Sequence, residues 1–150
     1  WNRIKLFDEW LVPVCSPDYQ GGSPWTAARL ADAELIHPSR DCRDWRRWLQ
    51  RVGWVEAVAW QQGKLFDTLE LGISAAAQGH GISIGDLALV DAELRKGSLM
   101  LPFDQAVRSG DSYYLVWPAA GEPPLTLTRM KEYLLQHLPD IGSCGVRLLD

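Results

Sequence analysis

The segment Gly81-Ile82-Ser83-Ile84-Gly85 has the spacing G-x-S-x-G, which in hydrolases carries a nucleophilic serine, and His80 lies beside it. Such a serine sits on a strained turn between a strand and a helix, where its Oγ is exposed. Here the pattern predicts a helix before the motif and places Ser83 inside a strand. We therefore expect a buried strand bounded by glycines, and a serine hydrolase using Ser83 is kept only as an alternative function.

The histidines and cysteines do not have the spacing of a metal site or of a disulfide framework. The chain has three of each: His37, His80 and His137, and Cys15, Cys42 and Cys144. No C-x-x-C pair occurs, and no His lies at the short separation from a Cys that zinc motifs use. We expect reduced thiols, no metal and no cofactor.

Composition bounds the class of protein. The chain has 150 residues, 47% hydrophobic and 23% charged, with a formal net charge of −4. This length fits one domain with a true core. No apolar run approaches the roughly 20 residues that cross a bilayer, and the acidic balance argues against a surface devoted to nucleic acid. We expect a soluble cytoplasmic protein with no membrane partner.

Strand patterns recur along the chain. The apolar run 9–15 closes at Ser16-Pro17 and predicts a largely buried strand, and short strands are expected at 34–37 and 82–84. Further candidates are residues 55–66, 98–101 and 112–117. Residues 141–150 show no clear period and are expected to form an irregular tail.

Helical patterns alternate with these strands. Trp45, Trp48, Leu49 and Val52 recur at helical spacing, which predicts an amphipathic helix over 44–52 with an apolar core face. Its arginines suggest DNA contact as an alternative, but we favour a solvated face. Other helices are expected at 27–30, 68–78, 88–96 and 125–138, and Asp67 and Glu70 have the spacing of a capping box. The alternation predicts an α/β fold with a mainly parallel sheet and flanking helices.

Four stretches, taken in order, resemble the effector-binding domain of LysR-type transcriptional regulators. They are LFDEWLVPVCSP at 6–17, AAAQGHGISI at 75–84, ELRKGSL at 93–99 and YYLVWP at 113–118. The resemblance covers residues 1 to about 139. Segment 37–49, which contains RDWRRWL, is most similar to the subgroup of the glycine-cleavage activator and the β-lactamase regulator.

The resemblance implies a type 2 periplasmic-binding-protein-like fold. Residues of about 15–114 would form a second lobe, while 1–14 and 115–139 would supply the crossing strands and the returning part of a first lobe, with 140–150 as a tail. We interpret the start at Trp1 as a fragment boundary, with the winged helix-turn-helix absent, so that DNA contact would come only through that missing domain. Homo-oligomerisation through the sensor domain is also implied.

The expected ligand site lies where strands end and helices begin. His37 ends a predicted parallel strand, at the edge where α/β sheets gather ligands, and the start of helix 68–78 offers free N–H groups and a positive dipole end. If Asp67 caps that helix, it competes with an anion, which leaves a neutral ligand, a zwitterion, or binding by Thr68 and Phe66. The predicted ligand-binding residues are Ser16, His37, Ser39, Arg40, Phe66, Thr68, Ile84 and Gly85.

The function expected from this resemblance is the sensing of a small metabolite by a transcriptional regulator, without catalysis. A stand-alone solute-binding protein is a further alternative, which would require a signal peptide before Trp1. The identity of the metabolite is left open.

Overall fold

The structure is a computed structural model that describes residues 1–19, 24–141 and 145–150. One sheet has the strand order β3-β2-β4-β1-β5-β6. Its strands are β1 (Asn2–Val14), β2 (Leu35–His37), β3 (Lys64–Leu65), β4 (Ile82–Asp86), β5 (Gln105–Trp117) and β6 (Arg147–Leu149). The helices are α1 (Ala27–Ala31), α2 (Arg43–Val52), α3 (Leu69–Ala77), α4 (Leu87–Lys96) and α5 (Leu125–Gln136).

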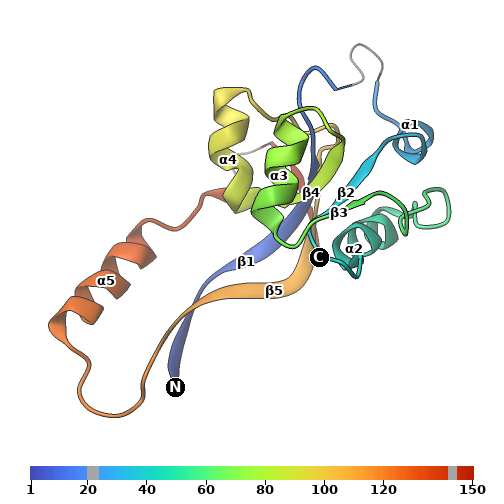
Figure 1. Cartoon of the computed structure of the whole chain (residues 1–150). Helices are drawn as coiled ribbons and strands as arrows, with labels where there is room; N and C mark the ends of the chain where they lie inside the picture. Colours follow the sequence, from blue (N-terminus) through green and yellow to red (C-terminus); the bar gives the residue numbers. More distant parts are fainter. Residues whose placement is uncertain (20–23, 142–144) are drawn as a thin grey trace.

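The sheet is mixed, with parallel pairing at β2–β3, β2–β4 and β5–β6 and antiparallel pairing of β1 with both β4 and β5. Strands β1 and β5 are much longer than the others and pair from Asn2↔Trp117 to Leu11↔Val107. They extend as a two-stranded ribbon beyond the helices, and α5 lies beside this ribbon (Figure 1). The expected α/β fold is confirmed.

Helices cover both faces of the sheet and bury two cores. Alternate residues of β1 pack into different cores, because successive side chains of a strand point to opposite faces. Leu11 packs with Trp45 and Trp48 of α2, whereas Val12 packs with Val90 of α4 and with residues of α3. The expected pattern of a strand buried on both faces therefore holds for the second half of β1.

The α2 core is built around tryptophans. Trp45 and Trp48 are fully buried, and each indole N–H donates to a backbone carbonyl: Trp45 to Ile36 O at 2.9 Å and Trp48 to Gln105 O at 3.0 Å. These hydrogen bonds satisfy the polar end of each ring and tie the helix to β2 and β5. The predicted core role of both rings is confirmed.

Three predictions of local structure are wrong. Only Lys64–Leu65 of segment 55–66 forms a strand, because the rest folds as turns around Val58 and Trp60. Segment 98–101 contributes only an isolated bridge between Cys15 and Met100. Residues 147–149 of the tail form β6, in which Arg147 N donates to Asp104 O at 2.6 Å. Residues 20–23 and residues 142–144, which include Cys144, lie outside the described residues.

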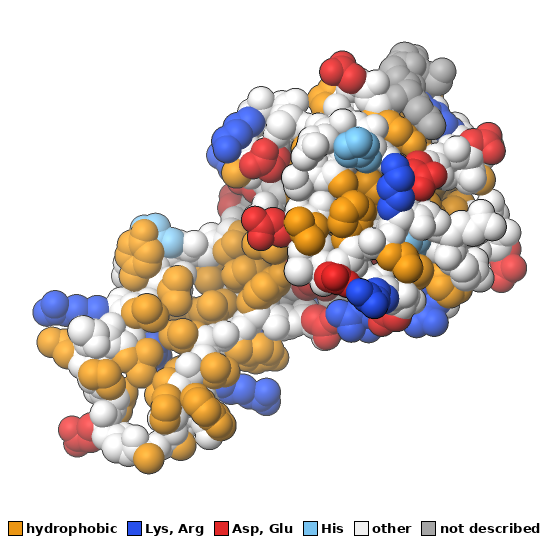
Figure 2. All heavy atoms as spheres, in the orientation of Figure 1, with side chains coloured by type: hydrophobic (Ala, Val, Ile, Leu, Met, Phe, Trp, Pro, Cys, Tyr) orange, Lys and Arg blue, Asp and Glu red, His pale blue; other side chains and the backbone are white. Residues whose placement is uncertain are grey.

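Helix α5 is exposed on its apolar side. Figure 2 shows hydrophobic side chains gathered over α5 and the outer part of the ribbon. The exposed residues there include Val116, Leu125, Met130, Tyr133 and Leu135. Among the described residues, no helix has the length and apolar character of a membrane span.

Candidate ligand-binding site

The carboxyl ends of three parallel strands meet at one edge of the sheet, which we term the carboxyl edge. Strand β2 ends at His37, β3 at Leu65 and β4 at Asp86. Helix α3 begins at Leu69, shortly after β3. Because Leu11 pairs with Asp86, the rest of β1 toward Asn2 runs past this edge. The edge and the ribbon therefore flank one region, the position at which α/β sheets bind ligands.

His37 is completely buried at the carboxyl edge. Its Nε2 lies 2.8 Å from Gln62 O, which fixes the orientation of the ring, whereas its Nδ1 has no hydrogen-bond partner in the described part of the chain. Burial lowers the pKa of this imidazole, against the opposing effect of the backbone hydrogen bonds to Gln62 and Trp60. A neutral ring with a spare nitrogen is a polar group available to a ligand.

The loop after β2 is linked to the loop after β3 by an ion pair. Arg40 Nε donates to Asp67 Oδ1 at 2.9 Å, and both side chains are largely exposed. Ser39 Oγ donates to Asp41 Oδ1 at 2.7 Å. The hydrogen bond to Asp67 and the charge of that carboxylate raise the pKa of the Arg40 guanidinium. Ser39 and Arg40 thus lie together at the carboxyl edge, as predicted.

Thr68, not Asp67, caps α3. Thr68 has extended backbone angles, and its Oγ1 accepts the N–H of Leu71 at 3.3 Å. Threonine here fills the role that the capping-box pattern gave to Asp67, which is instead paired with Arg40. Phe66, half-buried, donates its N–H to His37 O at 2.8 Å. Phe66 and Thr68 therefore lie at the carboxyl edge. Because Asp67 is paired with Arg40, its carboxylate does not compete with a ligand for the N–H groups in the first turn of α3.

Ile84 and Gly85 lie within β4, opposite Pro13 and Val12 of β1. The Ile84 side chain is fully buried in the α2 core. A Cβ at Gly85 would lie 2.8 Å from Val90 Cγ1, so the absence of a side chain allows α4 to pack closely. Neither position presents a side chain to an open surface, because Ile84 is buried and Gly85 has no side chain.

Ser16 is separated from the other predicted residues. Because β1 is antiparallel to β4, with Val14 opposite Ser83, the chain at Ser16 has passed toward the amino end of β4. Its Oγ accepts the N–H of Asp18 at 3.3 Å in a local turn. The structure does not bring Ser16 to the carboxyl edge.

Ser83 lacks the geometry of a nucleophile. It is completely buried in the middle of β4, and its Oγ donates to Ile84 O at 3.0 Å. This oxygen lies only 3.1 Å from the position of a Cβ on Gly72, under α3. An exposed hydroxyl on a strand-to-helix turn, which the hydrolase mechanism requires, is not what this serine presents.

Four residues at this edge were missed by the sequence reasoning: Glu9 of β1, Asp44 of α2, Asp86 of β4 and Tyr113 of β5. Asp86 caps α4 by accepting the N–H of Ala88 at 3.2 Å, and burial raises its pKa despite the lowering effects of Tyr113 and backbone N–H groups. Burial also raises the pKa of Asp44, and nearby Glu9 adds to the rise for both carboxyls. Only the position of Asp86, two residues after the predicted strand 82–84, could have signalled this group.

Residues 1–139 match the family described as the LysR substrate binding domain. The chain belongs to this family. The predicted identity and fold are thereby confirmed.

The relatives of this LysR substrate-binding domain include the expected subgroup. The glycine cleavage system transcriptional activator of Escherichia coli (strain K12) is 32% identical over 114 residues, which cover 75% of this chain and 37% of that protein. The transcriptional activator AmpR of Pseudomonas aeruginosa is 29% identical over 116 residues, 76% of this chain and 38% of that protein. The chain thus spans about two fifths of the length of the relatives it matches.

Solved effector domains have the same fold as this LysR domain. The effector domain of AmpR from Pseudomonas aeruginosa superposes with a TM-score of 0.71 at 26% identity, covering 90% of this chain and 64% of that one. The AmpR effector-binding domain from Citrobacter freundii superposes with a TM-score of 0.76 at 20% identity, covering 90% and 66%. These relatives are regulators, not enzymes, so neither they nor the geometry of Ser83 supports the hydrolase alternative.

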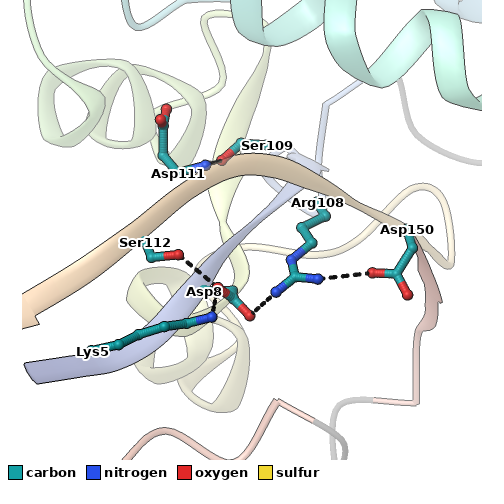
Figure 3. A network of polar contacts seen from close by, with 7 residues as sticks. All are labelled: Lys5, Asp8, Arg108, Ser109, Asp111, Ser112 and Asp150. Atoms are coloured by element: carbon teal, nitrogen blue, oxygen red, sulfur yellow. Dashed lines mark hydrogen bonds and ion pairs between the residues drawn. The ribbon is translucent and has the colours of Figure 1, made fainter.

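A polar network crosses the ribbon of this LysR domain next to the carboxyl edge. Asp8 on β1 accepts hydrogen bonds from Lys5 at 2.6 Å, from Ser112 Oγ at 2.6 Å and from Arg108, which also reaches Asp150 at 3.4 Å (Figure 3). These bonds, led by that from Lys5, lower the pKa of Asp8 to about 2. The network lies where the β1–β5 register shifts, between Lys5 and Phe7 and between Asp8 and Trp10.

Proposed function

We propose that this chain is the effector-sensing part of a transcriptional regulator, and that a small metabolite binds at the carboxyl edge. One observation carries the proposal: in a LysR substrate-binding domain, three parallel strand ends and the start of α3 meet beside the ribbon, with the Arg40–Asp67 pair at their rim. His37, Ser39, Arg40, Phe66 and Thr68 are the proposed contacts. Ile84 and Gly85 lie within β4 and offer the ligand no side chain, and Ser16 is left out because it lies toward the opposite edge.

The lobes follow from the same proposal. Residues of about 15–114 form the second lobe, and 1–14 with 115–139 supply the crossing ribbon and part of a first lobe, whose sheet would cover the exposed side of α5. The ligand binds between the lobes and favours one closure, because a ligand shifts a conformational equilibrium only by its differential affinity for the two states. The C-terminal tail is part of the sheet, because its strand β6 pairs with β5.

DNA binding, in this proposal, belongs to a helix-turn-helix domain outside residues 1–150. Three observations support this: relatives are named HTH-type regulators, this chain spans about two fifths of their length, and its net charge is −4. A cytoplasmic location and self-association through the sensor domain complete the proposal. A stand-alone solute-binding protein has no support among the relatives.

A thermal-shift screen of the full-length regulator tests the proposal. Amino acids, small carboxylates and cell-wall peptides are the compounds, and the expected result is a raised melting temperature with at least one of them, because a ligand that binds only the folded state stabilises it. Arg40→Gln is expected to weaken that effect, whereas Arg51→Gln, an exposed arginine at the far end of α2, should leave it unchanged. If no compound shifts the melting temperature, the receptor function fails.

A further inference from the structure

Three buried side-chain atoms lack a hydrogen-bond partner in the described part of the chain: His37 Nδ1, Asp44 Oδ1 and Asp86 Oδ2. His37 and Asp86 are completely buried, and Asp44 is 9% exposed. Buried polar atoms are almost always paired, so each exception requires an explanation. A bound ligand would supply the missing hydrogen bonds of all three atoms if the three residues face one region.

The strand pattern places them in one layer. Leu35 and Ile84 point into the α2 core, and because the strand repeat is two residues, His37 and Asp86 lie on that same face of the sheet. Asp44 comes from the first turn of α2, the helix that covers this face. All three residues therefore border the α2 layer at the carboxyl edge, just beyond the apolar core.

Glu9 joins this group from the ribbon. It interacts electrostatically with both Asp44 and Asp86, and in each case the interaction raises the pKa of the aspartate. Local arginines neutralise the group only in part: Arg43 Nε lies 3.6 Å from Asp44 Oδ1, and Arg47 is directed to Asp111 at 3.5 Å. Two buried carboxyl groups thus lie near the partly exposed Glu9, an arrangement that a cation stabilises.

We propose that Glu9, Asp44 and Asp86 form a subsite for a protonated amino group of the effector. The inference rests on the proposed receptor function, and it specifies the chemical class of the ligand. An ammonium group offers three N–H donors and no acceptor, which matches three carboxyl groups. An anionic group at this position would be repelled, and the described residues contain no cluster of His, Cys, Asp and Glu close enough to hold a metal ion.

Asparagine substitutions separate this role from a structural one. Asn caps a helix about as well as Asp, so Asp86→Asn removes the charge and keeps one oxygen that can accept from Ala88 N or from the neighbouring Tyr113 hydroxyl. If Asp86 is held charged for a ligand, Asp86→Asn and Asp44→Asn should leave the melting temperature of the unliganded protein equal or raise it. Glu56→Gln, at an exposed loop position after α2, is the matched control.

The probes are amines paired with hydroxyl analogues: alaninamide with lactamide, glycine with glycolate, and 1,4-diaminobutane with 1,4-butanediol. Thermal shift and calorimetry on the full-length protein are expected to show stabilisation by at least one amine and not by its analogue. That affinity should fall at least tenfold in Asp86→Asn and Asp44→Asn and stay unchanged in Glu56→Gln.

Two results would overturn the subsite and leave the receptor function intact: binding of a neutral or anionic analogue at least as tightly as its amine, or amine binding that survives both asparagine substitutions. A lowered melting temperature of Asp86→Asn with unchanged binding would likewise overturn the subsite, because the carboxylate of Asp86 would then serve its contacts with Tyr113 and the backbone and not a ligand. If no probe binds and the broader metabolite screen is also silent, both the subsite and the receptor function fail.

Discussion

The Thr68 hydroxyl oxygen lies 3.3 Å from the backbone nitrogen of Leu71 and accepts its N–H, so the first turn of α3 is closed by a threonine. Thr68→Ala removes this cap and is expected to lower the free energy of unfolding by about 1 kcal/mol. Asp67→Ala, one residue earlier, should cost less, because its partner is the exposed Arg40 side chain and not the helix. Urea unfolding of the two variants in parallel measures the difference, and an equal or larger loss in Asp67→Ala would contradict the assignment.

The ribbon network should make stability depend on pH in the acid range. The folded-state pKa of Asp8 is about 2, below its ordinary value of 3.8, so its ionised form is favoured by folding. The stabilisation is fully present above about pH 4 and is lost as the pH falls toward 2. Asp8→Asn is expected to cost about 1 kcal/mol at pH 6, after allowance for solvent screening, and progressively less toward pH 3.

Urea titrations of the wild type, Asp8→Asn and Glu122→Gln at several pH values measure this effect. Glu122 is exposed in the loop before α5 and serves as the control for a lost carboxylate. A difference between wild type and Asp8→Asn that stays constant from pH 6 to pH 3 would show that the network does not favour the ionised form of Asp8.

Trp45 anchors the α2 core by volume and by one hydrogen bond. Trp45→Phe keeps much of the ring but leaves the Ile36 carbonyl without its indole donor, and we expect a loss of about 1–3 kcal/mol. Trp45→Ala should cost about 3–5 kcal/mol, because it also opens a cavity. Trp1, which is 85% exposed, provides the control Trp1→Phe with little effect on the urea midpoint. Comparable midpoints for Trp45→Phe and Trp1→Phe would exclude an energetic role for the hydrogen bond.

Alanine substitutions at two glycines with positive φ distinguish the cost of backbone strain from the cost of a steric clash. Gly53 (φ 83°) has open space where a Cβ would lie, whereas a Cβ on Gly63 (φ 122°) would be 2.3 Å from Leu35 O. Gly53→Ala should cost about 1 kcal/mol from conformation alone, and Gly63→Ala about 2–4 kcal/mol, since the β2–β3 junction must shift as well. Thermal unfolding of both variants tests the ranking, which would be wrong if Gly53→Ala were the more damaging.

Helical periodicity was the most informative signal in the sequence. The repeat of Trp45, Trp48 and Leu49 predicted α2 to within one residue of its observed start, and Gly53 and Gly97 end their helices as expected. Local composition determines such features, because a helix makes its hydrogen bonds within one segment. Segment 55–66 failed for the converse reason: its apolar residues pack as separate anchors of turns against the α2 core, and no neighbouring strand pairs with most of them.

The candidate site was predictable only in part. His37 and Phe66 end predicted strands, and Ser39, Arg40 and Thr68 follow them, so the topology of a parallel sheet was enough to bring them together, although only the end of strand 55–66 forms. The separation of Ser16 and the approach of Glu9 to Asp86 depend on the register of β1 against β4, which pairs Leu11 with Asp86. Register arises from contacts between segments about 75 residues apart in the chain, and a single sequence carries no direct signal for it.

The register shifts in the ribbon limit how the two ends of this protein can move. A bulge places unequal numbers of residues opposite each other, so β1 and β5 cannot slide past one another without rebuilding the pairing on both sides of it. Twisting a two-stranded ribbon costs far less, because the cross-strand hydrogen bonds survive it. Whatever happens at the carboxyl edge would therefore reach the far end of the ribbon as a change of angle and not of length.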